Sequence, residues 1–157
     1  VGLSYKGFDF SMLWQGSALC SVQLSGPAVW DFPLYDQSRT GKVRKMHLNR
    51  WTPETAATAT YPALHYGIHN NNKQQYSSLF LYDASYIRLK NVEIGYTLPK
   101  AWTSKAGIQS VRIYAQGQNL LTFDRLGDVD MDPEIKNGDG SWFPVQRVVN
   151  LGINMTF

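Results

Sequence analysis

The sequence has little cysteine, little charge and no long apolar run, and each shortage excludes a class of protein. Its 157 residues include a single cysteine, Cys20, which excludes an internal disulfide framework and a cysteine-rich metal site. No stretch approaches the apolar length of a transmembrane helix. Charged residues make up 17% of the chain, and its Lys and Arg residues are scattered despite a net charge of +3, which argues against nucleic-acid binding.

Aromatic residues are plentiful by contrast. They make up 13% of the chain and include nine Tyr and five Trp, a composition that favours strands over helices. The chain is also long enough for one ordinary domain with a sizeable core. The composition therefore predicts an all-β chain.

Four segments alternate apolar and polar residues, as two-faced β-strands do. They are LSYKGFDFSMLWQGS at 3–17, SSLFLYDASYIRLKNVEIGYTLP at 77–99, SVRIYAQGQNLLTF at 110–123 and VVNLGINMTF at 148–157. The connection after the first segment is long and is predicted to be a loop with short helical pieces. The second connection is short, and the third is again long and rich in turn residues.

Two interpretations fit this pattern. Outer-membrane barrels have short turns on one side, long loops on the other, and strands that alternate apolar and polar residues. Four strands cannot close a barrel, so this interpretation requires most of the barrel to be absent from the chain. Soluble sandwiches also contain half-buried alternating strands. A barrel predicts that the following residues face lipid, whereas a sandwich predicts that they form one dry core: Phe8, Phe10, Met12, Trp14, Ile94, Ile113 and Leu151.

Several longer stretches resemble a known family. RWTPETAATATYPAL, DASYIRLKNVEIGYTLP, GQNLLTF, DMDPE and the final LGINMTF are similar to the C-terminal end of SusC/RagA-type TonB-dependent outer-membrane transporters. The resemblance extends from about residue 3 to residue 157. It implies that residues 1–157 are the C-terminal segment of a large barrel of antiparallel strands, of the 22-strand type, with long extracellular loops. The plug domain and most of the barrel would lie outside this chain.

The resemblance also implies a function and a location. A protein of this family imports glycan oligosaccharides or peptides across the outer membrane, without enzymatic activity and without a cofactor. Its expected partners are a SusD-type surface lipoprotein, TonB through the missing N-terminal parts, the barrel-assembly machinery and the lipid bilayer. The C-terminus would be periplasmic, and Phe157 would act as the assembly signal at that interface. The alternative function is a soluble, secreted β-rich module that binds glycans.

Two groups of residues are candidates for binding. Trp30, Trp51 and Trp142 fall in the long loops, where an indole could stack on a sugar, contact the lipoprotein, or simply hold the loop together. Five polar residues are expected on the polar side of their strands, where they could face the lumen or contact the plug: Arg88, Glu93, Arg112, Gln116 and Gln118.

Motifs for metal binding and catalysis are incomplete. Asp128, Asp130 and Asp132 have the spacing of a calcium loop, but Pro133 occupies the position where the EF-hand turn needs Gly. His65 and His69 are four residues apart, with Gly67 weakening any helix between them. No nucleophile elbow or phosphate-binding glycine loop is present. We therefore predict no metal site and no catalytic site.

Overall fold

A computed structural model describes residues 1–29, 43–64, 77–135, 137–140 and 142–157. The chain divides into two compact units, which we call the strand unit and the loop unit. The strand unit comprises Val1–Gly16, Tyr86–Phe123 and Val145–Phe157; the loop unit comprises Ser17–Ser85 and Asp124–Pro144. None of the helices that the structure describes has the length and apolar character needed to cross a bilayer.

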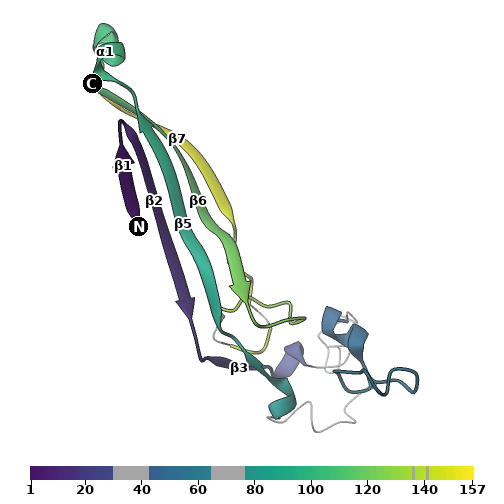
Figure 1. The fold of residues 1–157 in the computed structure, drawn as a ribbon. Coiled ribbons are helices and arrows are strands. Elements are labelled where there is room, and N and C mark those ends of the chain that lie inside the picture. The colour runs from purple at the N-terminus through teal and green to yellow at the C-terminus, as the bar shows by residue number, and fades with distance from the viewer. Residues whose placement is uncertain (30–42, 65–76, 136, 141) are drawn as a thin grey trace. The chain divides into compact units, whose positions relative to one another are not determined.

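The strand unit is one antiparallel sheet of five strands in the order β1-β2-β5-β6-β7 (Figure 1). Its strands are β1 Gly2–Tyr5, β2 Phe8–Ser17, β5 Tyr86–Thr97, β6 Ser110–Asp124 and β7 Val148–Thr156. This confirms the predicted all-β class with antiparallel strands. The sheet is open, and β1 and β7 are its edges among the described residues.

The first predicted strand is in fact a hairpin. Lys6 and Gly7 separate β1 from β2, and both have positive φ, 47° and 87°, as a two-residue type I′ turn requires. The register pairs Leu3 with Phe10 and Tyr5 with Phe8. A single strand over 3–17 was therefore the wrong prediction. Lys at the first turn position, in place of the usual Asn or Asp, concealed the turn signal.

The connection between β5 and β6 is short, as predicted. It contains the one-turn helix α1, Lys100–Thr103, followed by the 3₁₀ turn η5, Ser104–Ala106. Pro99 precedes the helix, and Gly107 ends the turn with φ of 71°, a left-handed conformation that Gly adopts without strain.

β6 and β7 pair over nine residues of each strand, from Ser110 opposite Thr156 to Gln118 opposite Val148. Asn119 follows the last pair with φ of 53°, and its side-chain amide donates to the Gln146 carbonyl at 3.1 Å. Asn tolerates this left-handed backbone better than most residues. The ladder with β7 therefore ends where Asn119 adopts a left-handed backbone conformation, while β6 itself continues to Asp124.

The loop unit has a hydrophobic core of its own. It contains β3 Ser21–Gln23, which pairs antiparallel with β4 Leu81–Asp83, and the 3₁₀ turns η1 Gly26–Ala28, η2 Lys45–Asn49 and η4 Ser78–Phe80. The sequence predicted the short helical pieces but neither this small sheet nor the core. The core residues are Val22, Leu24, Ala28, Val29, Met46, Tyr61, Phe80, Ala84, Leu126 and Val129.

Polar contacts hold this core together. The Tyr61 hydroxyl donates to the Val29 carbonyl at 2.7 Å, and the Tyr61 ring lies 4.7 Å from that of buried His47. The backbone N–H of Arg44 donates to Nδ1 of His47 at 3.1 Å. The Tyr61 carbonyl accepts from the backbone N–H of Trp51 at 2.7 Å, so the core fixes the backbone that carries this tryptophan.

Candidate functional site

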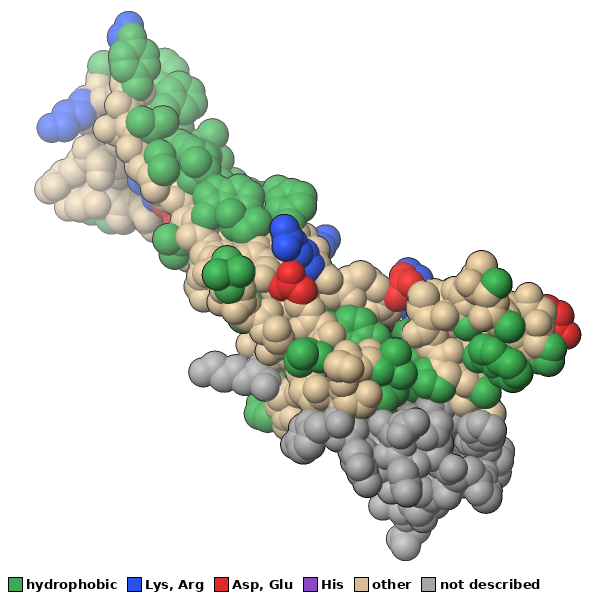
Figure 2. All heavy atoms as spheres, turned by 60° about the horizontal axis from the view of Figure 1, so that its bottom comes forward, with side chains coloured by type: hydrophobic (Ala, Val, Ile, Leu, Met, Phe, Trp, Pro, Cys, Tyr) green, Lys and Arg blue, Asp and Glu red, His purple; other side chains and the backbone are tan. Residues whose placement is uncertain are grey.

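One face of the strand unit is apolar and exposed; we call it the apolar face. The directly opposed pairs Ile113 with Ile153 and Ala115 with Leu151 place their side chains on this face of β6 and β7. Ile153 is 59% exposed and Leu151 82%. On β2 and β5, the Phe8 ring lies 4.4 Å from the Tyr96 ring and continues the same face. Figure 2 shows hydrophobic side chains following one another along this part of the molecule.

The seven residues proposed to distinguish a barrel from a sandwich do not form a dry core. Five of them are exposed, and Phe10 and Met12 are half-buried. The buried hydrophobic cluster of the described chain lies entirely in the loop unit. The packed interior that a sandwich predicts for these residues is therefore missing from the described part of the chain.

The opposite, polar face is organised around Arg112. Its Nε donates to Oδ1 of Asp9 at 3.0 Å, and its Nη2 contacts both Oδ2 of Asp9 and Oε1 of Glu93, the latter at 2.5 Å. Asp9 is on β2, Glu93 on β5 and Arg112 on β6, so the three side chains link three adjacent strands. We call these residues the charge cluster. Their side chains are between 25% and 37% exposed, and the cluster has a formal charge of −1.

Gly95 makes room for the guanidinium of Arg112. A Cβ atom added at Gly95 would lie 2.5 Å from Nη2 of Arg112, well inside van der Waals contact. Because Gly95 has no side chain, Arg112 can extend across β5 from β6 and reach Asp9 on β2. The missing side chain thus determines which strands the charge cluster connects.

Tyr114 extends the same face toward the edge strand. It is paired with Gly152 on β7, where an added Cβ would come within 2.4 Å of Cζ of Tyr114. The Arg112 guanidinium lies 5.1 Å from the centre of the Tyr114 ring, within cation–π range. The Tyr114 ring therefore covers Gly152 and flanks the charge cluster.

The structure brings together two of the five polar residues proposed for lumen or plug contacts, Glu93 and Arg112. Gln116 lies opposite Asn150 and Gln118 opposite Val148, further along β6. Arg88 is buried, and its Nε donates to Oγ1 of Thr122 at 2.9 Å. Whether any of these residues contacts a plug stays a prediction.

Asp9 is a member of the charge cluster that the sequence reading missed. It is the only acidic residue among the first 29, and it alternates with Phe8 and Phe10, so it had to lie on the polar face. An isolated acidic residue on the polar side of a strand was therefore the feature of the sequence that could have identified Asp9 as a candidate. Its partner Arg112 is 103 residues away along the chain, and no local pattern connects the two.

In the loop unit, two of the three proposed tryptophans are exposed. Trp51 is 47% exposed and Trp142 63%, while Trp30 lies outside the described residues. Phe143, which the sequence reading did not single out, is almost fully exposed next to Trp142. Exposed rings can contact a ligand or partner, whereas a ring that only holds a loop together is expected to be buried.

Two of the three aspartates with calcium-loop spacing bond to nearby protein groups. Asp128 accepts from the Asn49 amide at 3.1 Å, and Asp132, which is buried, accepts from the backbone N–H of Glu134 at 3.0 Å. Among the residues that the structure describes, no three His, Cys, Asp or Glu side chains gather as a potential metal site. His65 and His69 lie outside the described residues.

Two side chains of β4, Tyr82 and Asp83, have shifted pKa values. Hydrogen bonds from Ser85, assisted by Arg125, hold the pKa of Asp83 below its ordinary value. The Ser85 N–H donates to Oδ1 at 2.9 Å, and Arg125 lies 3.3 Å from Oδ2. Burial, and secondly the charge of Asp128, raises the pKa of Tyr82.

Phe157 follows the last paired residue of β7 and is exposed. The carbonyl of Thr156 accepts from the backbone N–H of Gln109 at 2.8 Å, so this end of β7 lies beside the β5–β6 connection. The role of Phe157 as an assembly signal stays a prediction.

Comparison with known proteins identifies relatives over nearly the whole chain. No protein-family model matches it. Two TonB-dependent receptors of Formosa agariphila, P3 and P26, are each 30% identical over 99% of this chain. The TonB-dependent receptor SusC of Bacteroides thetaiotaomicron is 26% identical over the same share. The chain spans only 14% to 16% of the length of these relatives.

Solved structures agree. The structure of the RagAB peptide transporter matches with a TM-score of 0.72 and 25% identity, over 99% of this chain and 16% of the transporter chain. Its open-open and closed-closed states match with TM-scores of 0.71. The resemblance to SusC/RagA-type TonB-dependent receptors that the sequence predicted is therefore confirmed.

Proposed function

We propose, on the premise that this chain is homologous to a segment of the SusC/RagA-type TonB-dependent receptors, that it forms part of the barrel wall of an outer-membrane nutrient importer. The observation that carries this proposal is the two-faced sheet, with an exposed apolar face on one side and the charge cluster on the other. In a bilayer, the apolar face meets lipid and the polar face meets the water-filled lumen. The role is transport, with no catalytic step assigned to this chain.

The open edges of the sheet support the same proposal. β1 and β7 each present a row of backbone groups with no partner strand among the described residues. Such groups are not tolerated in hydrocarbon, so a sheet that lies in a bilayer must continue into further strands on both sides. We propose that residues 1–157 are the C-terminal segment of a barrel of the 22-strand type, inserted by the barrel-assembly machinery with Phe157 as its signal.

The orientation follows from the lengths of the connections. The Lys6–Gly7 turn and the β5–β6 connection are both short and lie at the end of the sheet where β7 finishes (Figure 1). In outer-membrane barrels the short turns are periplasmic. We therefore propose that this end, and with it Phe157, is periplasmic, and that the long connections that follow β2 and β6 are extracellular loops.

The charge cluster has a structural role in this wall. Arg112 is engaged by two carboxylates of its own sheet, so the cluster presents only a net single negative charge to the lumen. We propose that it holds β2, β5 and β6 together, and that Gln116 and Gln118 are better placed to contact a plug. Energy would come from TonB through parts of the protein outside this chain.

The exposed aromatic rings of the loop unit bear on the class of substrate. The loop unit exposes Trp51 and Trp142, which suit stacking on sugar rings or packing against a SusD-type lipoprotein. Both oligosaccharides and peptides remain candidate substrates. The same exposed indoles favour the second candidate function, a secreted glycan-binding module.

The decisive experiment is fractionation of the source cells followed by uptake. We expect the native protein with this sequence in the outer membrane, with a mass several times the 17.8 kDa of this chain. Uptake of labelled oligosaccharide or peptide should depend on TonB. Trp51→Ala and Trp142→Ala should reduce uptake, whereas Leu48→Ala, which removes an exposed apolar side chain from the same loop unit, should not. A soluble native species of 17.8 kDa that binds glycans would instead establish the second candidate.

A further inference from the structure

One end of the strand unit combines lysines with exposed aromatic rings. This end consists of residues 5–8, 98–109 and 155–157, which we call the basic rim. It contains Lys6, Lys100 and Lys105 and no acidic side chain. Tyr5, Trp102 and Phe157 are each about two-thirds exposed or more.

Hydrogen bonds hold the three segments of the basic rim together. The backbone N–H of Thr97 donates to the carbonyl of Gly7 at 2.7 Å and joins the β1–β2 turn to the end of β5. The Gln109 N–H donates to Thr156 at 2.8 Å and joins the start of β6 to the end of β7. Figure 1 shows α1 and the C-terminus together at this end.

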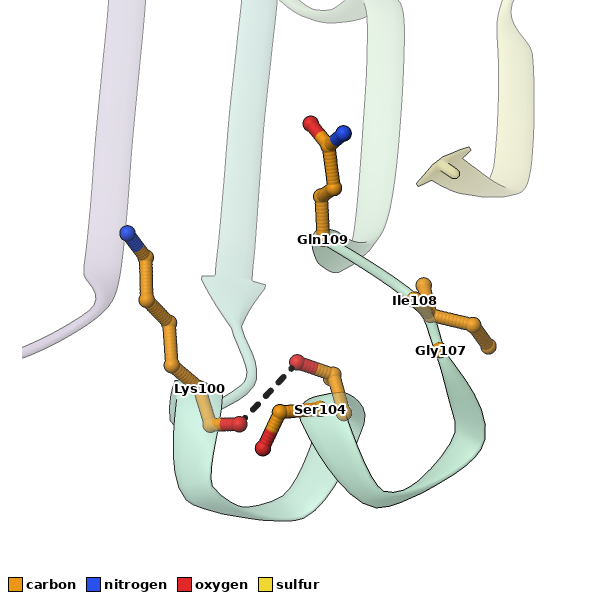
Figure 3. A pocket seen from close by; sticks show the side chains of 6 residues that line it. Lys100, Ser104, Gly107, Ile108 and Gln109 are labelled. Atoms are coloured by element: carbon orange, nitrogen blue, oxygen red, sulfur yellow. Dashed lines mark hydrogen bonds between the residues drawn. The ribbon is translucent and has the colours of Figure 1, made fainter.

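A hollow of about 440 Å³ opens on the basic rim, and we call it the rim hollow. Its lining residues are Lys100, Thr103, Ser104, Gly107, Ile108 and Gln109. Figure 3 shows Lys100 and Gln109 extending their side chains in the same direction, Lys100 from α1 and Gln109 from just before β6.

The groups that can donate in the rim hollow are side chains. The backbone N–H groups of Gly107 and Gln109 already donate to Ser104 and Thr156. The Thr103 hydroxyl turns back to the Lys100 carbonyl at 3.4 Å. The Lys100 ammonium, the Ser104 hydroxyl and the Gln109 amide are left to bind a ligand, and all three residues are exposed. One cation and two neutral donors, with no acid among the described lining residues, suit a phosphate group.

We propose that the rim hollow binds the phosphate of an anionic phospholipid headgroup. The inference rests on the proposed function, because it requires the apolar face to lie in the bilayer with the basic rim at the membrane surface. Lysines near an anionic leaflet are attracted to it, and Trp is favoured at the headgroup level.

The neighbouring aromatic rings favour a phospholipid over free phosphate or an acidic protein segment. Trp102 is 67% exposed and directly follows Lys100 and Ala101 on α1, while Phe8 and Phe157 are also exposed at the basic rim. A ligand that satisfies both the donors and these rings must carry an anionic head and apolar tails. Free phosphate would satisfy only the donors.

The test uses the full-length transporter that contains this sequence, purified in detergent. Native mass spectrometry counts retained lipids while dioleoylphosphatidylglycerol, dioleoylphosphatidylcholine or inorganic phosphate is added. We expect preferential retention of phosphatidylglycerol. Because a lysine near an anionic surface contributes about fivefold to affinity, Lys100→Gln should lose about fivefold and Lys100→Gln with Lys105→Gln about 25-fold.

Two matched variants separate the rim hollow from general electrostatic attraction. Lys45→Gln removes an exposed lysine from the loop unit and should leave lipid retention unchanged. Ser104→Ala keeps every charge but removes a donor from the hollow, and it should weaken phosphatidylglycerol binding. Unheated electrophoresis confirms that each variant remains folded.

Each contrary result has a distinct meaning. Equal retention of the two lipids, unchanged retention in the double lysine variant, or indifference to Ser104→Ala would overturn the rim-hollow proposal. Displacement of the lipid by inorganic phosphate at equal concentration would overturn the choice of phospholipid as ligand. Absence of the native protein from the outer-membrane fraction would overturn the proposed function itself. That outcome is measured by fractionation and does not depend on the lipid titration.

Discussion

A lysine placed on the apolar face should be far more harmful than one placed on the polar face of the same strand. Ile153 lies one residue from Gly152, the middle residue of the nine in β7, and its side chain is exposed on the apolar face. Asn150 is two residues from the middle and belongs to the polar face, opposite Gln116. We compare Ile153→Lys with the matched control Asn150→Lys in the full-length protein that contains this sequence.

The expected magnitude follows from the position along the strand. At about 3.3 Å per residue and a tilt of about 45°, Ile153 lies only about 2 Å in depth from the middle of β7. A lysine at the bilayer midplane of a barrel destabilises it by about 2 to 4 kcal/mol, which corresponds to about 30-fold to 700-fold in the folding equilibrium. If this face met water, the same exposed substitution would change the stability by less than about 0.5 kcal/mol.

The assay is urea unfolding in phosphatidylcholine vesicles, followed by the mobility of the folded protein in unheated electrophoresis. Ile153→Lys should shift the midpoint to much lower urea, or abolish the folded band, whereas Asn150→Lys should leave it close to that of the wild type. Equal midpoints for the two variants would refute the assignment of the apolar face to lipid. A larger effect at Asn150 would mean that the two faces had been assigned the wrong way round.

Three further predictions follow from named contacts. Gly152→Val should displace the Tyr114 ring and destabilise the sheet by about 1 to 3 kcal/mol in the same urea assay. Tyr114→Ala should be less harmful in the Gly152→Val background than in the wild type. Arg112→Met leaves two carboxylates without their shared cation and should lower the urea midpoint only modestly, since partly exposed ion pairs contribute little to stability. Arg112→Lys should recover only part of this loss, because an ammonium lacks the fork of a guanidinium. The lowered pKa of Asp83 contributes stability that is present above its ordinary pKa and is lost as the pH falls through the lowered value. The melting temperatures of wild type and Asp83→Asn should therefore converge below about pH 4, and a constant difference would contradict this.

The sequence predicted the strands best where their two faces differ most. In β7 each apolar residue alternates with Asn, Gly or Thr, and this strand was predicted almost to the residue. The Lys6–Gly7 hairpin was missed because alternation continues on both sides of it, and the turn alone interrupts the strand. A strand pattern indicates faces, whereas turns depend on one or two residues with positive φ.

The loop-unit core was beyond the reach of such patterns. Its members come from segments as distant as Val22, Met46, Phe80 and Leu126, and no local pattern in the sequence connects these segments. The charge cluster has the same origin, since Asp9 and Arg112 meet only when β2, β5 and β6 have assembled. Contacts of this kind depend on the topology of the whole sheet, which no local stretch of sequence encodes.

The two faces of the sheet together specify its register. Because side chains alternate with a period of two, a slip of β6 by one residue would turn Ile113 toward the polar face and Arg112 toward the apolar face. A slip of two residues would restore the faces, so hydrophobicity alone does not exclude it. That slip would, however, move Arg112 away from Gly95, the position with no side chain to block it, and away from Glu93. The alternation of apolar and polar residues therefore decides which side of β6 faces which way. The charge cluster, together with Gly95, decides between the registers that this alternation allows.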